Sequence, residues 1–471
     1  MKTAPLLILP LMLTACATTV PAPPTVTAQT YAPGGDAAVL PEASGVTQTL
    51  TTAASTDRWW TAFGSPQIDA LVERALAANP DLKARNAALT AVRETYKAQA
   101  SSLWPQASAG YNLERAQNAN SLSSPLSSTS PPSLYTLHTA QVSVGYAVDF
   151  WGAGRQGLKA AKYQTDAVAL QTEAARRALI ANVVSAAVQA AALGDQVRIA
   201  GRAAGDSEKL LAYAQKQKAL GNMGDADVAN VVNLAALDRQ AEIGLRHALF
   251  VQLRLLGSLT GQGPAAPVGV PASLADLTLP AGLPMVLPVD IVNLRPDIRY
   301  AAAQFDAAAA SVHAARAARL PSIALDGSAG GASTQLASLF TQGNGFWSLG
   351  LGIAEPLTGA VGLYHQQKAA EAQLVAAQAQ YQSTVQAALG GIADTLDALY
   401  ADARATASAD TQAQTTAQLL DGQKRQTALG QSGDADVLAA DRAAAQAEVA
   451  QSLARSQRYA DTVALFLAMG S

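Results

Sequence analysis

The sequence is poor in the residues that build most catalytic and metal sites. Cys16 is the only cysteine among 471 residues, so it has no disulfide partner and no second thiolate with which to hold a metal ion. The four histidines are scattered, no His-Glu-x-x-His or cysteine–histidine spacing occurs, and the glycine-rich stretches lack a phosphate-binding lysine. We therefore expect no catalytic residue, no metal site and no bound cofactor, and we predict that the protein is not an enzyme.

A large excess of one charge is also missing. The formal net charge is -3, with acidic and basic residues interspersed along the chain. Nucleic-acid-binding proteins instead concentrate positive charge on one surface. The sequence therefore argues against a nucleic acid as a partner.

The N-terminus has the layout of a secretion signal. A short basic start and an apolar stretch at 4–13, too short to span a bilayer, lead to Leu-Thr-Ala-Cys at 13–16. These four residues resemble the lipobox of bacterial lipoproteins. The resemblance implies removal of 1–15 and a covalent lipid on Cys16, with diacylglycerol on the sulfur and an acyl group on the nitrogen. Ala17 implies sorting to the outer membrane, and the alternative is a chance cysteine beside an ordinary cleavage site.

The segment 16–58 is predicted to be an extended tether between lipid and fold. Residues 17–56 are rich in Pro, Thr, Ala and Gly and offer little that could form a core, so we expect structure to begin near Trp59. The roughly 410 residues that follow are too many for one ordinary core and suit two domains or one elongated body.

The chain contains an internal duplication. The sequence ALGNMGDADV at 219–228 recurs as ALGQSGDADV at 428–437, with eight of ten positions identical. The two copies of this motif lie 209 residues apart, whereas upstream matched positions such as Pro80 and Pro296 lie 216 residues apart. The first copy therefore has a longer loop between these points. We assign a first repeat to 59–260, a linker to 261–290 and a second repeat to 291–471.

Each repeat predicts the same order of elements. A helix of roughly 23 residues starts at Pro80 or Pro296, because proline fits the first turn of a helix. Two strands with alternating apolar residues follow, then a very long helix, then a return helix after the repeated glycine motif. The strands are expected at 106–115, 138–149, 322–332 and 346–355, and the long helices at 158–219 and 363–428.

Four strands per chain are too few to close a barrel. Val142, Val144, Tyr146 and Val148 should point to one face of the sheet, with Ser143, Gly145 and Ala147 on the other. An open sheet would leave edges unpaired in lipid, where no water satisfies them, so closure requires other chains. Three chains would supply twelve strands. The alternative is a small soluble sheet packed on helices.

The long helical segments have coiled-coil spacing. Apolar residues recur at alternating steps of four and three, and a helix of about 60 residues would be roughly 90 Å long. Glu173, Arg176 and Arg177 exclude a transmembrane helix there. The seam positions are Leu179, Val183, Ala186, Ala190, Leu193 and Val197, with Tyr381, Val385, Ala388, Ile392, Leu396 and Leu399 in the second copy.

From Trp59 to about Leu467, the chain resembles the TolC-type outer-membrane efflux factors, in particular the lipoprotein branch that serves resistance-nodulation-division pumps. The landmarks are Trp59-Trp60 with Phe63, Asn79-Pro80-Asp81-Leu82, 147–152 (AVDFWG), 294–298 (LRPDI), 314–321 (AARAARLP) and Pro356-Leu357. Two departures, Thr358 in place of the usual aromatic residue and Gly359-Ala360-Val361-Gly362 in place of a Gly-Arg-type turn, leave the strand exit less defined.

The resemblance implies an α+β membrane protein that assembles as a homotrimer. A transmembrane barrel of twelve strands, four per chain, would continue into a periplasmic barrel of long helices. Such a channel exports drugs or other small toxic compounds passively, with a periplasmic membrane-fusion adaptor and an inner-membrane pump as partners. Heavy-metal efflux and type I secretion are alternatives within the family. A soluble lipoprotein enzyme and a trimeric coiled-coil surface adhesin are alternatives from other classes.

The repeated turn is the most informative local feature. Its glycines suit a left-handed helix end, and the acidic residues Asp225, Asp227 and Asp434 suit the cap and first turn of the next helix. A helix–turn–helix needs nothing more than this. The resemblance adds that the turns are periplasmic tips where the adaptor docks, at Gly221, Gly224, Gly430 and Gly433.

Asp436 is a candidate for the narrowest point of the tunnel. The resemblance places acidic residues just after the second turn, where three copies of Asp436 would surround one axis and attract cations. Ala439 occupies another such position, so this constriction would be less acidic. The alternative for Asp436 is a second cap residue.

Overall fold

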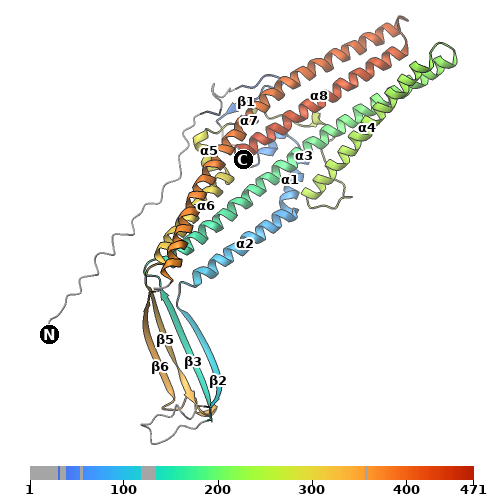
Figure 1. Cartoon of the computed structure of the whole chain (residues 1–471). Coiled ribbons are helices and arrows are strands. Elements are labelled where there is room, and N and C mark those ends of the chain that lie inside the picture. Colours follow the sequence, from blue (N-terminus) through green and yellow to red (C-terminus); the bar gives the residue numbers. More distant parts are fainter. Residues whose placement is uncertain (1–29, 32–38, 53–56, 118–133, 356–358, 471) are drawn as a thin grey trace. The chain divides into compact units, whose positions relative to one another are not determined.

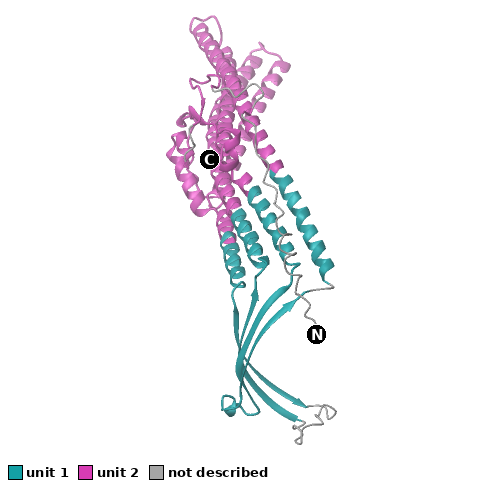
Figure 2. Ribbon diagram, turned by 90° about the vertical axis from the view of Figure 1, so that its left-hand side faces the viewer, with its two compact units in different colours: residues 1–23, 89–168, 301–381 teal, residues 24–88, 169–300, 382–471 magenta. Residues whose placement is uncertain are grey.

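The computed structural model describes residues 30–31, 39–52, 57–117, 134–355 and 359–470. Cys16 and the predicted signal therefore lie outside the described residues. The chain divides into two compact units (Figure 2). Among the described residues, unit 1 is built from 89–168 and 301–381, and unit 2 from the remainder.

Unit 1 contains a four-stranded antiparallel sheet in the order β2-β3-β5-β6 (Figure 1). The four predicted strands are confirmed, although β3 begins four residues earlier than predicted. Their bounds are β2 Gln106–Gln117, β3 Leu134–Val148, β5 Ser322–Ser333 and β6 Gly345–Ala354. A short 3-10 turn, Leu336–Ser338, lies between β5 and β6.

The helices predicted to start at Pro80 and Pro296 begin at those residues. Helix α2 spans Pro80–Ser101 and helix α6 spans Pro296–Ala317. Asn79 Oδ1 accepts a hydrogen bond from the amide of Leu82 at 2.9 Å, and proline at the first position loses no intrahelical bond. Asn79 and Pro80 therefore define where α2 begins.

The long helices are α3, Ala153–Ala219, and α7, Ala360–Ala428, and each precedes a return helix, α4 Asp225–Leu259 or α8 Asp434–Ala468. Both long helices begin before the predicted residue. For α3 the reason is Asp149, whose carboxylate accepts hydrogen bonds from the amides of Gly154 and Arg155 at 3.0 and 2.8 Å. This cap satisfies amides of the first turn and allows the helix to start at once after the strand.

The predicted seam residues are buried, except Val197, which is half-buried. In unit 2, the α3–α8 contact includes Ile199, Ala203 and Ala445, which pack with Val449. In unit 1, Phe305 and Val312 of α6 pack on Ala370 and Leu374 of α7. One 18-residue window of α3 is apolar enough to cross a membrane, but 72% of it is buried inside the protein, as in a core helix.

Several elements of unit 2 have no counterpart in the sequence prediction. They include a parallel pair formed by β1, Thr49–Thr51, and β4, Gly282–Pro284. The others are the 3-10 turns Trp59–Phe63 and Leu274–Asp276 and the helices α1, Pro66–Ala78, and α5, Pro288–Leu294. Structure therefore begins before Trp59, and the predicted tether and linker both contain ordered residues.

The expectation that residues before 59 form no core is wrong for 39–52. Leu40 and Gln48 in this segment are fully buried. Arg458 of α8 is also fully buried and donates hydrogen bonds to Gln48 Oε1 at 2.9 Å and to the carbonyls of Ala43 and Val46 at 3.0 and 3.2 Å. A buried guanidinium needs such acceptors, so polar contacts hold a segment whose composition predicts an extended chain.

Candidate functional site

The sheet of unit 1 has one apolar face. Trp347 pairs with Ala329, which pairs with Val142, so these side chains share a face, and the predicted alternation of β3 is confirmed by this register. The apolar side chains of β6 on this face are strongly exposed within the chain: Trp347 79%, Leu349 76%, Leu351 65% and Ile353 68%. A face of this kind needs an apolar surrounding.

The opposite face is polar or small. Ser143 pairs with Ser328, which pairs with Ser348, and the hydroxyls of Ser328 and Ser348 are 2.8 Å apart. Asp326 and Gln106 share this face. Within the described residues, the outer edges of β2 and β6 have no strand partner. The sheet can therefore separate an apolar phase from a polar one, but only if its edges are paired by something else.

Both repeated turns end their long helix in the same way. Gly221 and Gly430 have φ angles of 76° and 75°, the left-handed conformation that glycine adopts without a steric cost. The amide of Asn222 bonds the carbonyl of Gln217 at 2.9 Å, and that of Gln431 bonds Gln426 at 2.9 Å. This Schellman pattern confirms the predicted helix ends. No other residue lies within 4 Å of a Cβ placed on either glycine.

The aspartates lie in the first turns of the return helices, as predicted, but the N-cap residues themselves are glycines. Gly224 and Gly433, not the aspartates, occupy the N-cap positions of α4 and α8. Asp225 and Asp434 are the first residues of these helices, and Asp227 lies in the first turn of α4. The carboxylate of Asp225 pairs with Lys218, 2.5 Å from its Nζ, and this hydrogen bond lowers the pKa of Asp225.

Asp436 has a cap contact in its own chain. Its Oδ2 accepts a hydrogen bond from the amide of Gly433 at 2.9 Å, which forms one half of a capping box. Asp227 Oδ2 lies 3.5 Å from the Cβ position of Gly224, at the corresponding place in the first repeat. A pore-facing role for Asp436 therefore has to coexist with capping.

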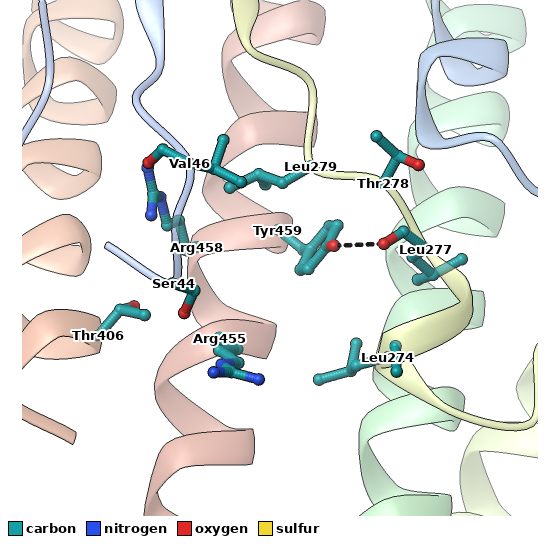
Figure 3. A pocket seen from close by; sticks show the side chains of 11 residues that line it. Ser44, Val46, Leu274, Leu277, Thr278, Leu279, Thr406, Arg455, Arg458 and Tyr459 are labelled. Atoms are coloured by element: carbon teal, nitrogen blue, oxygen red, sulfur yellow. Dashed lines mark hydrogen bonds between the residues drawn. The ribbon is translucent and has the colours of Figure 1, made fainter. Parts of the chain in front are cut away.

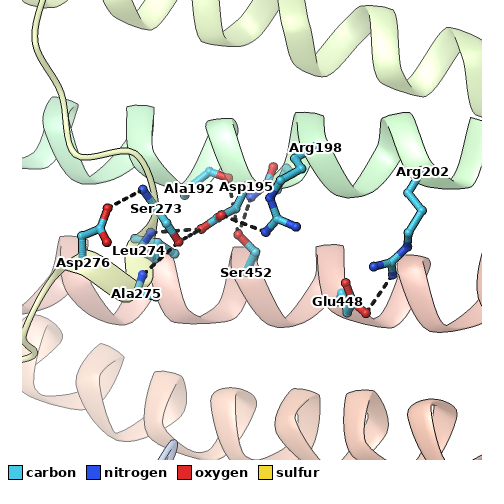
Figure 4. Close-up of polar contacts among 11 residues, drawn as sticks. Ala192, Asp195, Arg198, Arg202, Ser273, Leu274, Ala275, Asp276, Glu448 and Ser452 are labelled. Carbon is cyan, nitrogen blue, oxygen red and sulfur yellow. Dashed lines mark hydrogen bonds and ion pairs between the residues drawn. The ribbon is translucent and has the colours of Figure 1, made fainter.

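Polar contacts join the two repeats within unit 2 (Figure 4). Arg202 of α3 binds Glu448 of α8 at 2.8 Å, and Gln196 of α3 contacts Ser452 of α8. Asp195 accepts hydrogen bonds from the Ser273 hydroxyl at 2.8 Å and the Leu274 amide at 3.0 Å. The inter-repeat segment is thereby fixed to α3, and no local sequence pattern indicates these pairs.

A cavity of about 340 Å³ lies beside Arg458 in unit 2 (Figure 3). It is lined by Ser44, Leu274, Leu277, Thr406, Arg455 and Tyr459, among others. The Tyr459 hydroxyl donates to the carbonyl of Leu277 at 2.9 Å, and burial raises the pKa of Tyr459 to about 12. The Ser44 hydroxyl donates to Asp410 Oδ2 at 2.7 Å, and neither histidine nor cysteine is among the lining residues.

Asp402 of α7 and Asp461 of α8 form a carboxyl pair that the sequence analysis missed. Burial and then the hydrogen-bonding Asp461 raise the pKa of Asp402 to about 7, and Arg458 opposes this rise. Like charges held together share a proton in this way. Within the described part of the chain, no group of three or more His, Cys, Asp or Glu residues is placed to hold a metal ion.

The sequence matches the model of the family described as "Outer membrane efflux protein" over residues 71–262 and 287–471. The pyoverdine export outer membrane protein OpmQ of Pseudomonas putida is 28% identical over 400 residues, which are 83% of this chain and 81% of that protein. The toluene efflux pump outer membrane protein TtgF of Pseudomonas putida is 30% identical over 291 residues, 62% of this chain and 59% of that protein.

Solved structures share the fold. The outer membrane protein VceC of Vibrio cholerae has a TM-score of 0.78 and 25% identity, with 89% of this chain and 99% of that chain covered. The Campylobacter jejuni CmeC outer membrane channel has a TM-score of 0.81 and 22% identity, with 89% of each chain covered. These structural similarities extend over most of the chain.

Proposed function

Because this chain belongs to the outer membrane efflux protein family, we propose that three copies form one passive exit duct across the outer membrane. Family membership makes the protein an outer-membrane efflux channel that works with an adaptor and an inner-membrane pump, and not an enzyme. The trimer, the closed barrel, the lipid anchor and the docking site are the proposed parts.

The observation that carries the barrel is the two-faced sheet with unpaired edges. Pairing β6 of one copy with β2 of the next satisfies the edge amides and carbonyls, which lipid cannot do. Twelve strands result, with Trp347 and Leu349 toward lipid and Ser348 and Asp326 toward the lumen. The long helices would continue the duct into the periplasm.

Disulfide trapping tests this closure, because Cys16 is the only native cysteine. Asn112→Cys on β2 is combined, one at a time, with cysteine substitutions at successive positions 346–352 of β6. We expect at least one register to give covalent trimers on oxidation in outer-membrane preparations. The matched control places the first cysteine at Ser143 in the interior strand β3 and should give none. Monomers in every register would overturn the barrel.

We also propose that Cys16 carries the lipid. The signal layout supports this, and a diacylglycerol together with an N-acyl group supplies more than one acyl chain, which is enough for stable membrane anchoring. Labelling with radioactive palmitate should mark the wild type and not Cys16→Ala, which should remain unprocessed or mislocalised. An unlabelled wild-type protein would contradict the proposed lipid anchor but not the proposed channel.

The two turns at Gly221 and Gly430 are the proposed adaptor-docking tips. Space around both glycines is open within the chain, so a side chain there meets nothing internal and would obstruct only a partner. Gly221→Asn and Gly430→Asn tolerate the left-handed conformation, and we expect them to weaken export while trimers persist. Gly422→Asn, inside α7 and equally open, is the control. Adaptor crosslinks confined to the middle of the helices would contradict this site.

For the cargo, we propose small organic compounds. Relatives are named for pyoverdine export, toluene efflux and fusaric acid resistance. A passive duct imposes little selectivity of its own, so the pump selects among such compounds. Deletion of the gene should raise susceptibility to some organic solvents or antibiotics, and complementation should reverse it. Unchanged susceptibility together with sensitivity to metal salts would favour heavy-metal efflux.

A further inference from the structure

Aromatic side chains gather at the end of the sheet where β3 leads into α3. Trp104 is 71% exposed and Phe150 is 64% exposed, and Phe150 stacks edge-on against Trp151 with ring centroids 4.8 Å apart. The indole of Trp151 donates to the carbonyl of Pro321 at 2.7 Å, which fixes its position. Exposed aromatic rings at the end of a lipid-facing sheet belong at the membrane–water boundary.

An open cavity of about 810 Å³ lies among these rings. It is lined by Leu103, Trp104, Tyr146, Val148, Phe150 and Leu158, among others. Tyr146 and Val148 are the last residues of the apolar face of β3, so the cavity continues the surface that the proposed barrel turns toward lipid. An apolar hollow joined to that surface is accessible to a lipid chain.

Positive charge borders the same cavity. Arg155 lines it, as does Asp149, and remains 67% exposed, although its Nε donates to the Asp149 carboxylate at 3.1 Å and its Nη2 to the Asp149 backbone carbonyl at 3.0 Å. Asp149 is already engaged by the first amides of α3. Lys159 and Lys162 follow on α3 at exposed positions, and no acidic residue precedes Asp166 in this helix. The local charge therefore suits a phosphate.

The second repeat does not reproduce this arrangement. The residue 216 positions after Trp104 is Leu320, and the residue 209 positions after Arg155 is Tyr364. The tryptophan and the arginine thus occur together in the first repeat alone. The membrane boundary surrounds both repeats, so a general requirement for interfacial aromatic residues does not account for this difference.

We propose that this cavity binds one phospholipid of the inner leaflet, with an acyl chain among Leu103, Trp104 and Leu158 and its phosphate at Arg155. The inference rests on the proposed function, because it requires the apolar face of the sheet to lie in the membrane. A trimer would carry three such sites. Each would fix the depth of the strand-to-helix junction in the bilayer.

The test uses the full chain in vesicles of phosphatidylethanolamine and phosphatidylglycerol that contain a trace of phosphatidylglycerol with a photoreactive acyl chain. Crosslinked peptides are mapped by mass spectrometry. We expect crosslinks enriched at 100–105 and 146–158 relative to the exposed apolar residues of β6. Arg155→Ala should reduce the enrichment roughly fivefold, as expected for the loss of one basic contact to a phospholipid. Trp104→Ala should also reduce it.

Matched controls separate the possible outcomes. Arg319→Ala removes another exposed arginine of unit 1 and should leave the enrichment unchanged. Crosslinks at Leu349 and Leu351 without enrichment at the cavity would overturn the lipid site but retain the membrane-facing sheet. Crosslinks at neither place would overturn the sheet assignment itself. A photoreactive diacylglycerol, which lacks phosphate, should show no dependence on Arg155.

Discussion

Arg442 of α8 binds Asp238 of α4 through two hydrogen bonds, from Nε to Oδ2 at 2.5 Å and from Nη2 to Oδ1 at 3.0 Å. The two side chains are only 20% and 10% exposed, and the hydroxyl of Ser207 in α3 also donates to Asp238. Residues 204 positions apart thus join the return helices of the two repeats. Because both charges are largely removed from water, each depends on the other.

Replacing Arg442 with Met should therefore destabilise the folded protein strongly. The change leaves Asp238 buried without its cation, a loss of about 3–5 kcal/mol in the free energy of unfolding. Thermal or denaturant unfolding of the detergent-solubilised protein measures it. The double variant Asp238→Leu/Arg442→Met should recover most of the stability, because no unpaired charge remains. A single-variant loss no larger than that of Arg239→Met, at a more exposed arginine, would contradict this prediction.

Arg458→Met should release the segment 39–52 without unfolding the helices. The variant removes the donors to Gln48 and to the carbonyls of Ala43 and Val46, and each buried acceptor left unpaired costs about 1–3 kcal/mol. Hydrogen exchange should rise at 43–50, and limited proteolysis should begin there. Arg239→Met, at an arginine of α4 that pairs with Glu208 and Glu242, should leave this segment protected. Equal protection in both variants would refute the anchoring role of Arg458.

Local chemistry explains which parts of the fold could be predicted from the sequence. Pro80 and Pro296 mark helix starts through their fixed backbone angle, the alternation around Val142 marks a strand, and Gly221 and Gly430 mark left-handed helix ends. These signals act over a few residues and survive in any tertiary context. Because the chain is duplicated, each of these signals occurs twice. Its occurrence in one repeat therefore supports the same assignment in the other.

The remaining features depend on contacts between distant residues. Arg458 is 410 positions from Gln48, so nothing near either residue indicates that 39–52 is ordered. The N-cap residue was misassigned for a different reason. Asp225 has suitable chemistry for an N-cap, but Gly224 occupies that position, and the carboxylate of Asp225 pairs with Lys218. The sequence identifies residues that are chemically suited to a role, but the folded geometry determines which of several adjacent residues performs it.

The pH dependence of stability should include a contribution from Asp402. Its pKa is raised to about 7 in the folded protein, because burial and Asp461 favour the neutral form. The folded state therefore holds a proton that the unfolded state loses above about pH 4. The contribution of the Asp402 carboxyl to the free energy of unfolding is greatest below pH 4. It declines as the pH rises to about 7 and is constant at higher pH.

Asp402→Asn removes this titration and resembles the protonated side chain. The variant should gain about 1–2 kcal/mol over the wild type at pH 8 and little at about pH 3.5, below the unfolded pKa, after allowance for partial solvent exposure. Unfolding measured at both pH values tests this. Asp397→Asn, at an exposed position on the same helix, is the matched control substitution. A gain for Asp402→Asn that does not depend on pH would exclude the shared proton.

Conductance should depend on the charge of Asp436 more than on that of Asp227. If α7 and α8 line the tunnel, three Asp436 carboxylates surround its axis and attract cations. Asp436→Asn is the sharper variant, because its amide oxygen can still accept the hydrogen bond from Gly433 while the charge is lost. Single-channel recording in planar bilayers should then show reduced cation selectivity.

Capping and charge are separated by comparing variants at the two turns. Asp436→Ala loses both and should also cost about 1 kcal/mol of helix stability through the cap. Asp227→Asn removes a charge from the first turn of α4 and should leave selectivity unchanged. Ala439→Asp adds a second acidic ring about one helical turn away and should sharpen selectivity or block by divalent cations. If Asp436→Asn and Asp227→Asn leave conductance and selectivity equally unaffected, Asp436 serves only as the cap of α8, and the narrowest ring lies elsewhere.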